Sequence, residues 1–202
     1  MSETRVLSLW SDDTINEEDS RILREACDDL PIPLDNESKK AIKTLVDAFL
    51  ERDDASGLAA PQIGITKKVI IFRSKGFEKD GASDSKWTKK DVEVLINPRI
   101  TQSRGDKIVL PEGCLSCPDI KVEISRFPEI KVRGFDIHGQ KISKRYLDYV
   151  ARIVQHEMDH LEGKLFVDYL SDLKRERIRK RLDKDRKERA NKTREASPAR
   201  AY

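Results

Sequence analysis

Residues 148–163 read DYVARIVQHEMDHLEG, and this stretch decides the fold that we expect. Its periodicity predicts a helix from about Asp148 to Glu162, which stops at Gly163 because glycine readily takes the conformation that ends a helix. The helix also carries enough apolar surface to be buried in the domain. The apolar positions flanking its polar motif are Val150, Ile153, Val154 and Leu161.

The polar motif HEMDH lies inside this predicted helix. His156 and His160 are four residues apart, so both lie on one face and can direct their imidazole nitrogens at one metal ion. Glu157 lies beside them and can take a proton from a metal-bound water. The chain has only three histidines, and two of them have this ligand spacing. The motif therefore predicts a metal site rather than two unrelated histidines on a helix surface.

A catalytic metal site generally needs three protein ligands and an open position. No histidine follows His160, Glu162 is too close in sequence, and Glu176 lies in the charged C-terminal segment. Cys114, in the upstream stretch EGCLS, is the better candidate, because a thiolate with two imidazoles suits Fe(II), Zn(II), Ni(II) or Co(II). Cys117 forms a C-x-x-C pair with it, but a zinc ribbon needs a second pair, so we expect Cys117 to be a bystander that is close enough to Cys114 for a redox vulnerability.

The rest of the chain mixes helices with short strands. A helix capped by Asp35 or Asn36 is expected to run to about Arg52, and a third helix is expected from about Ser171 toward Ala190. Strands bracketed by helices, without regular alternation, predict an α+β domain. The expected strands cover residues 69–72, 92–96, 108–110, 120–124, 130–135 and 142–146.

Three further segments are assigned from their composition. Residues 12–34 are polar with scattered apolar positions. Residues 73–91 are expected to form a long surface excursion between strands. His138 and Gly139 fall in a turn between two alternating runs, which predicts a hairpin.

Composition and charge limit the class of protein. The chain of 202 residues is 37% hydrophobic and 38% charged, which suits one domain with a tail. No apolar run approaches the roughly 18 residues of a membrane span, and three cysteines are too few for a disulfide scaffold, so a cytoplasmic protein is expected. Residues 171–202 hold 13 Lys and Arg against 6 Asp and Glu, whereas residues 1–170 hold 27 against 31. This basic segment favours a polyanion such as RNA, and a solvated helix face is the equal alternative.

Three motifs in order carry a resemblance to a known family. GLAAPQIG at 57–64, EGCLS at 112–116 and HEMDH at 156–160 resemble the three motifs of peptide deformylase. The similarity covers essentially residues 5–180, including INP at 96–98. It implies an α+β fold with antiparallel β-sheets around a central helix that carries the HExxH motif, followed by a C-terminal helix.

The resemblance also implies a reaction. Peptide deformylases remove the formyl group from N-formylmethionine at the start of nascent polypeptides and release formate. The implied cofactor is one divalent metal ion, Fe(II) foremost with Zn(II), Ni(II) or Co(II) as substitutes, held by Cys114, His156 and His160. A metal-bound water, as hydroxide, would attack the formyl carbon, with Glu157 as general base and then general acid.

Further site residues follow from the same resemblance. The Gln62 side chain and the Leu115 backbone N–H would stabilise the oxyanion, and Glu112 would pair with Arg126 to brace the cysteine loop. The substrate peptide would pair with the backbone near Gly57, and its methionine would enter a pocket that includes the His156 ring. The implied substrate-binding residues are Ser56, Gly57, Leu110, Gly113 and Ile153.

Two departures from the family pattern lie just before the first motif's leucine. The family usually has Gly-x-Gly before the first motif's leucine, and here Ala55, Ser56 and Gly57 occupy those positions. If the first glycine normally has a positive φ, Ala55 must shift or strain the backbone. Ser56 would make the rim of the cleft more polar.

Two segments with different roles are expected. Residues 1–170 would form the catalytic domain, and residues 171–202 a basic helix and tail that docks on the ribosome, on rRNA and protein near the exit tunnel. No membrane partner is expected. Two other functions fit parts of the sequence: HExxH alone suits a zinc endopeptidase, and the basic tail alone suits a non-enzymatic RNA- or ribosome-binding protein.

Overall fold

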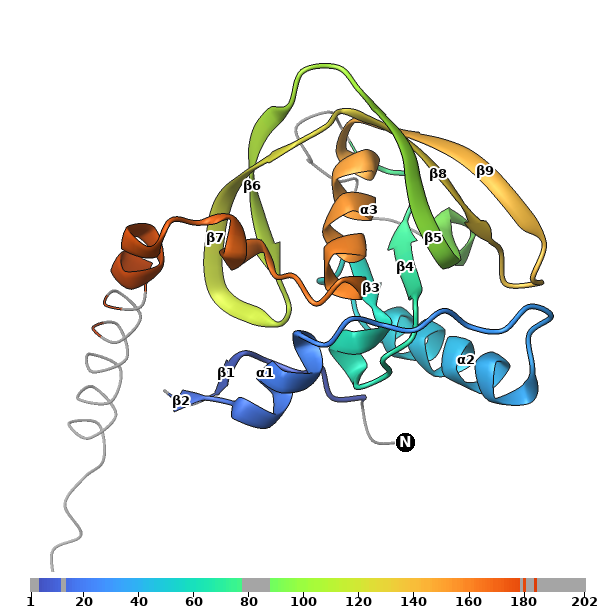
Figure 1. The fold of residues 1–202 in the computed structure, drawn as a ribbon, viewed down its shortest axis with the longest axis horizontal. Helices are drawn as coiled ribbons and strands as arrows, with labels where there is room; N and C mark the ends of the chain where they lie inside the picture. Colours follow the sequence, from blue (N-terminus) through green and yellow to red (C-terminus); the bar gives the residue numbers. More distant parts are fainter. Residues whose placement is uncertain (1–3, 12–13, 78–87, 179, 181–183, 185–202) are drawn as a thin grey trace, which may run out of the picture.

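A computed structural model describes residues 4–11, 14–77, 88–178, 180 and 184 of the chain (Figure 1). The architecture is the predicted α+β arrangement, with antiparallel sheets packed around a central helix. None of the described helices has the length and apolar composition that crossing a membrane requires. The elements in chain order are β1 (Trp10–Ser11), β2 (Thr14–Ile15), α1 (Glu17–Leu23), α2 (Asn36–Leu50), β3 (Gly57–Ala59), η1 (Ala60–Ile63), β4 (Val69–Arg73), η2 (Lys89–Asp91), β5 (Val92–Arg104), β6 (Ile108–Cys114), β7 (Cys117–Arg126), β8 (Glu129–Phe135), β9 (Lys141–Leu147), α3 (Asp148–Leu161) and η3 (Phe166–Tyr169).

The main sheet has five antiparallel strands in the order β3-β4-β5-β8-β9. The side chains of strand β4 show what packs on each face of the sheet, because successive side chains of a strand point to opposite faces. Ile70 and Phe72 pack in the cluster that includes α3, whereas Val69 and Ile71 pack in the cluster that includes α2. Both faces are thus buried, which accounts for the unbroken apolar run VIIF.

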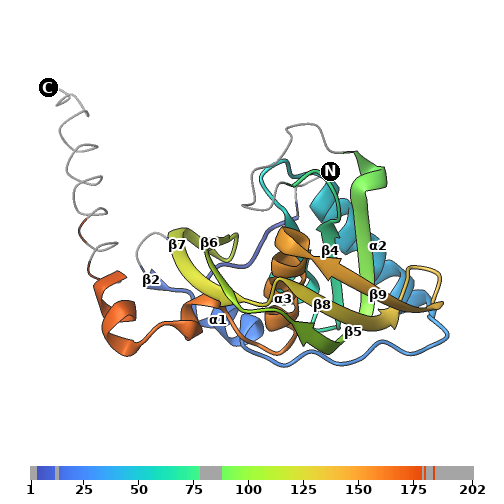
Figure 2. The same cartoon turned by 90° about the horizontal axis from the view of Figure 1, so that it is seen from above.

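Helix α3 lies between the main sheet and the hairpin of β6 and β7, which forms a separate two-stranded sheet (Figures 1 and 2). The helix begins and ends where the sequence predicts. Gly163, just after its end, has a φ of +67°, and a side chain there would come within 2.3 Å of the Arg24 carbonyl oxygen. Glycine is therefore required both by the backbone conformation and by close packing.

The other predicted elements are also found, with longer strands in several places. Helix α2 has Asp35 as its N-cap, and the turn at Gly139 joins β8 and β9 as a hairpin. Residues 172–178 are helical, and so are Lys180 and Lys184, which agrees with the start of the expected third helix. Its continuation toward Ala190 lies outside the described residues, as do residues 78–87 of the expected excursion.

Helix α1 was not predicted from the sequence. Asn16 caps it by accepting a hydrogen bond from the Asp19 backbone N–H at 3.1 Å. Leu23, which is fully buried, anchors the helix against Leu7, Leu165 and Phe166. A helix of 7 residues is too short to show a periodic apolar stripe, so its position depends on this tertiary contact.

Strand β5 is much longer than the predicted run of 92–96. Residues 95–98 are buried, but residues 99–104 are exposed and, apart from Ile100, polar, so they lack a strand-like apolar pattern. They are held by pairing with β8, across register shifts that begin at Ile96. Asn97, with a φ of 47°, occupies this irregularity.

Candidate functional site

Two elements bring the predicted metal ligands together. Helix α3 carries His156 and His160 one turn apart, and the end of β6 carries Cys114. One ligand atom from each of these residues lies within 4.8 Å of the other two. The Cys114 Sγ is 3.3 Å from the His160 Nε2, and the two imidazole ring centres are 5.1 Å apart. Residues separated by more than forty positions in sequence thus form one potential ligand set.

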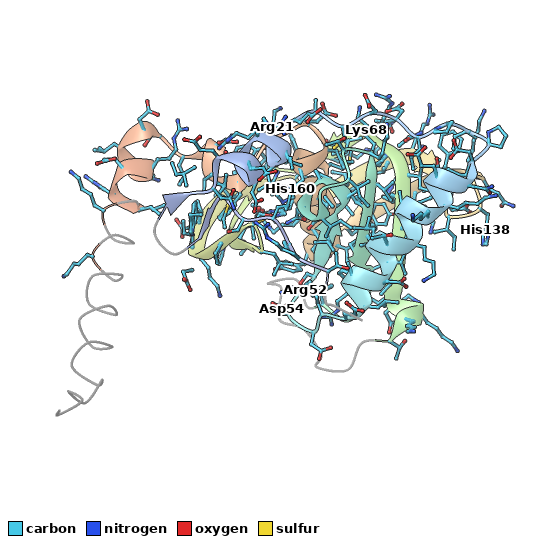
Figure 3. The ribbon with its side chains drawn as sticks, turned by 90° about the horizontal axis from the view of Figure 1, so that it is seen from below. Arg21, Arg52, Asp54, Lys68, His138 and His160 are labelled. Atoms are coloured by element: carbon cyan, nitrogen blue, oxygen red, sulfur yellow. The ribbon has the colours of Figure 1, made fainter. Side chains whose placement is uncertain are left out.

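The third histidine lies elsewhere. Figure 3 shows His160 within the body of the molecule and His138 at its outer edge. His138 belongs to the β8–β9 turn, where its backbone N–H donates to Asp136 at 2.9 Å. His138 therefore has a local role in a turn.

Glu112 orients one of the two site histidines. Its Oε2 is 2.9 Å from the His156 Nδ1. Burial opposes ionisation of Glu112, but hydrogen bonds from His156 and Arg126 outweigh it and lower the Glu112 pKa to about 2. An ionised carboxylate only accepts hydrogen bonds, so the His156 Nδ1 carries the proton of this bond. With Nδ1 occupied, Nε2 is the nitrogen that can bind a metal ion.

The expected Glu112–Arg126 pair is present and belongs to a larger buried cluster. Arg126 Nε and Nη2 donate to the two Glu112 oxygens at 3.0 Å each. Arg126 Nη1 also donates to Asp159 at 2.6 Å. Arg152 of α3 donates to Glu112 Oε1 at 2.6 Å, a contact that the sequence analysis missed. The sequence signal was an arginine on the apolar face of a helix.

Cys117 lies directly beside the proposed cysteine ligand. It is the cross-strand partner of Cys114 in the β6–β7 hairpin, and it lines the cavity. A hydrogen bond from Cys117 is the largest cause that lowers the pKa of the Cys114 thiol, with the charge of His160 also contributing. Cys117 is therefore a neighbour of the proposed ligand and lies outside the three-residue cluster of potential metal ligands.

Glu157 is positioned as an unpaired acid beside the ligands. Its side chain is buried, and its Oε2 has no hydrogen-bond partner among the described residues. Burial raises the pKa of Glu157 to about 7, against the opposing charges of His156 and His160. Gly57 of β3 lies directly against this carboxyl group, because a methyl group added at Gly57 would come within 2.5 Å of Oε1. A carboxyl group with this environment is suited to proton transfer near neutral pH.

Gln62 is held with its amide nitrogen toward the cysteine. Its Oε1 accepts from the Ala59 backbone N–H at 2.8 Å, which leaves Nε2 free to point toward the hairpin. Nε2 donates to Ser116 Oγ at 3.1 Å and lies 3.6 Å from Cys114 Sγ. The orientation of this donor is thus set by the backbone of the first motif.

A cavity of about 640 Å³ opens beside these groups. Most of the expected substrate-binding residues lie on its wall, and Leu110, which is half-buried on β6, is not among the described residues that line it. Tyr149 and Arg152 are lining residues that the sequence analysis did not include. The expected substrate-binding residues on the wall are Ser56, Gly57, Gly113 and Ile153. The expected catalytic residues Gln62, Leu115 and Glu157 also line the cavity.

The departure from the family pattern before Leu58 causes no visible backbone strain. Ala55 is buried and is not among the described residues with a positive φ. Ser56 lines the cavity, and its carbonyl oxygen accepts from the Arg73 backbone N–H at 2.9 Å. An alanine therefore fits at position 55 with an ordinary backbone.

Comparison with known sequences gives a family match. Residues 13–176 match the sequence model of the polypeptide deformylase family. A peptide deformylase from Nitrosococcus oceani is 42% identical over 148 residues, which are 72% of this chain and 81% of that protein.

Solved structures of similar proteins give the same result. A peptide deformylase from Plasmodium falciparum has a TM-score of 0.71 and 28% identity, covering 89% of this chain and 94% of that one. The Met-Ala-Ser-bound class I type b peptide deformylase from Acinetobacter baumannii has a TM-score of 0.67 and 28% identity, covering 84% of this chain and 99% of that one.

Proposed function

The chain belongs to the polypeptide deformylase family, whose members are metal-dependent hydrolases that remove the N-formyl group from nascent peptides, and on this premise we propose how its own residues perform the reaction. Cys114, His156 and His160 hold one divalent metal ion, and Glu157 transfers the protons. One observation supports the proposal above all. One potential ligand atom from each of the three residues lies within 4.8 Å of the other two, beside a buried glutamate.

The donor set suits a divalent transition metal. One thiolate and two imidazoles combine a soft ligand with two intermediate ones, and the proton on the His156 Nδ1 leaves Nε2 available. We propose Fe(II) as the ion, with Zn(II), Ni(II) or Co(II) as substitutes. A divalent ion bound here supplies Lewis acidity, which activates water for attack on a carbonyl carbon near neutral pH.

Glu157 is the proposed general base and acid. Its carboxyl group accepts a proton from the attacking water and later donates that proton to the departing amine. The raised pKa of about 7, caused mainly by burial, brings both protonation states within reach at neutral pH. Its contact with Gly57 places it next to the strand that would meet the substrate.

Two hydrogen-bond donors are proposed to stabilise the oxyanion. They are the Gln62 Nε2 and the Leu115 backbone N–H. The Gln62 amide is oriented by its bond to Ala59, and Leu115 directly follows Cys114 on the cavity wall. Both donors therefore come from groups that are already adjacent to the cysteine ligand.

The substrate is proposed to bind as an added strand. Strand β3 is at an edge of the main sheet, so its outer side can pair with an extended peptide. Ser56, Gly57 and Gly113 would contact the peptide backbone, and the methionine side chain would enter the cavity beside Ile153 and the His156 ring. Leu110 remains a proposed contributor to this pocket, although it is off the cavity wall.

The C-terminal segment is proposed to act separately from the catalytic residues. We propose a catalytic domain of residues 1–170 and a basic helix and tail of residues 171–202 that docks on rRNA and protein near the ribosomal exit tunnel. The excess of Lys and Arg in this segment and the helix at 172–178 support the proposal. An enzyme that works on emerging chains in this way acts in the cytoplasm.

A formate-release assay tests the proposed reaction. Met-Ala-Ser is bound in the Acinetobacter baumannii neighbour, so formyl-Met-Ala-Ser is a suitable substrate for this chain. We expect protein purified without oxygen to release formate, to lose activity on chelation and to regain it with Fe(II). Casein cleavage, measured in parallel, would instead indicate an endopeptidase. Metal analysis of the anaerobic protein identifies the ion.

A further inference from the structure

Arg152 is a buried arginine with no role in the proposed reaction. It lies on the cavity-facing side of α3 and is only 4% exposed. Arginine is almost never buried to this degree unless its charge and its five N–H groups have partners. The partners of this side chain therefore show what it does.

Those partners belong to the hairpin that carries Cys114. Arg152 Nη1 donates to Glu112 Oε1 at 2.6 Å and to the Ile124 carbonyl oxygen at 2.9 Å. Nη2 donates to the Ile108 carbonyl oxygen. Ile108 is in β6 and Ile124 is in β7, so one guanidinium group on the helix binds both strands of the hairpin and the Glu112 carboxylate of β6.

Arg152 also completes the surroundings of Glu112. Both Glu112 oxygens accept from Arg126, Oε1 also accepts from Arg152, and Oε2 is bonded to the His156 Nδ1. These four contacts use the full accepting capacity of the carboxylate. Within the buried cluster, Arg126 and Arg152 balance the charges of Glu112 and Asp159. Loss of Arg152 would leave surplus negative charge beside His156.

The hairpin needs such an attachment because it is not part of the main sheet. In the described part of the chain, β6 and β7 form a backbone ladder only with each other, so side-chain contacts with α3 help to hold Cys114 near the two histidines. We propose that Arg152 is a positioning residue of the metal centre, which locks the hairpin on α3 and sets the distance from Cys114 to His156 and His160. This inference rests on the proposed function, since it assigns the same three residues as metal ligands.

Cobalt binding tests this role without relying on activity. The full-length protein is stripped of metal and titrated with Co(II), whose absorption bands report both affinity and ligand geometry. Arg152→Met removes the charge and all three hydrogen bonds at similar volume. Arg152→Lys keeps the charge but cannot bridge both strands. Asn97→Ala is the matched destabilised control, because Asn97 binds the Leu30 backbone on the α2 side of the sheet.

We expect Arg152→Met to weaken Co(II) binding about 10- to 100-fold, the usual effect of removing a partner of a metal ligand. Its thiolate-to-cobalt band should also weaken, Arg152→Lys should lie between it and the wild type, and Asn97→Ala should bind Co(II) normally. Wild-type affinity and spectrum in Arg152→Met, or an equal loss in Asn97→Ala, would overturn the proposal. If Arg152→Met does not fold, wild-type Co(II) binding by Arg152→Lys would overturn it.

The proposed function can fail independently of this inference. Wild-type protein that binds Co(II) through a thiolate but releases no formate would contradict the proposed reaction. The comparison of Arg152 variants would still decide whether Arg152 positions the ligands.

Discussion

At the scale of single residues, Glu157 is buried and lies on α3 next to both histidines. We expect Glu157→Ala to keep its metal but to lose about 10²- to 10⁴-fold in deformylation rate, because a general acid–base group typically contributes that much. Formate release and metal content of the same preparation measure the two effects. Glu162→Ala, at the exposed end of the same helix, is the control that should retain activity. A loss below tenfold for Glu157→Ala would contradict the assigned role.

We expect the correct position of the Glu157 carboxyl group to require glycine at position 57. In Gly57→Ala the new methyl group would lie 2.5 Å from the Glu157 Oε1, so the carboxyl group must move. We expect folded protein with normal metal content and a clearly reduced kcat, measured with formyl-Met-Ala-Ser. Wild-type turnover would mean that the Glu157 position is not critical.

The two cysteines of the hairpin should respond differently to substitution. Cys114→Ser removes a proposed ligand and is expected to lower both metal content and activity. Cys117→Ser should largely keep both, because Cys117 is outside the ligand cluster and serine can still donate a hydrogen bond to Cys114. Metal analysis and activity assays under anaerobic conditions make the comparison. An equal metal loss in both variants would show that the ligand set is wrongly assigned.

At the scale of elements, Asn97 joins the irregular centre of β5 to the segment before α2. Its side chain accepts from the Leu30 N–H and donates to the Leu30 carbonyl oxygen, both at 2.8 Å. Asn97→Ala leaves these buried groups unpaired, so we expect a loss of about 1–3 kcal/mol in the free energy of unfolding, measured by urea denaturation.

The variant Asn97→Gly separates two causes of that loss. It also lacks the amide, but glycine adopts the φ of 47° at this position without the strain of alanine. Asn97→Gly should therefore unfold at a higher urea concentration than Asn97→Ala. The reverse order would show that the backbone conformation contributes nothing.

At the scale of the whole molecule, we expect the basic C-terminal segment to bind the enzyme to the ribosome and to take no part in the deformylation reaction. We expect truncation after Leu170 to abolish most ribosome co-sedimentation while leaving turnover of a short formylated peptide nearly unchanged. Binding of the full chain should weaken steeply as salt rises, because each neutralised phosphate releases counterions.

A second truncation guards against loss of folding. Ile178 packs against the cluster that contains Leu165, Phe166 and Leu170, so removal of 171–202 exposes part of that cluster. Truncation after Arg181 keeps this contact and removes most of the remaining tail. If both truncated proteins co-sediment as well as the full chain, the segment does not bind the ribosome.

Features that depend on local spacing could be predicted from the amino-acid sequence alone. The i and i+4 positions of His156 and His160, the end of α3 at Gly163 and the Asp35 cap follow from helix geometry and backbone preferences, which act within a few residues. The α+β class also followed, because apolar periods distinguish strands from helices before any contact forms. Ligand chemistry indicated Cys114 as the third metal ligand, and the family resemblance added Gln62 to the candidate site.

How distant segments meet became visible only in the tertiary structure. It placed Cys117 beside Cys114, left Leu110 off the cavity wall and gave Arg152 its partners on β6 and β7. Helix α1 likewise depends on burial of Leu23 against residues that come much later in the chain. The physical reason is that burial and hydrogen bonding depend on which groups pack together in space, whereas sequence patterns describe only neighbours along one element.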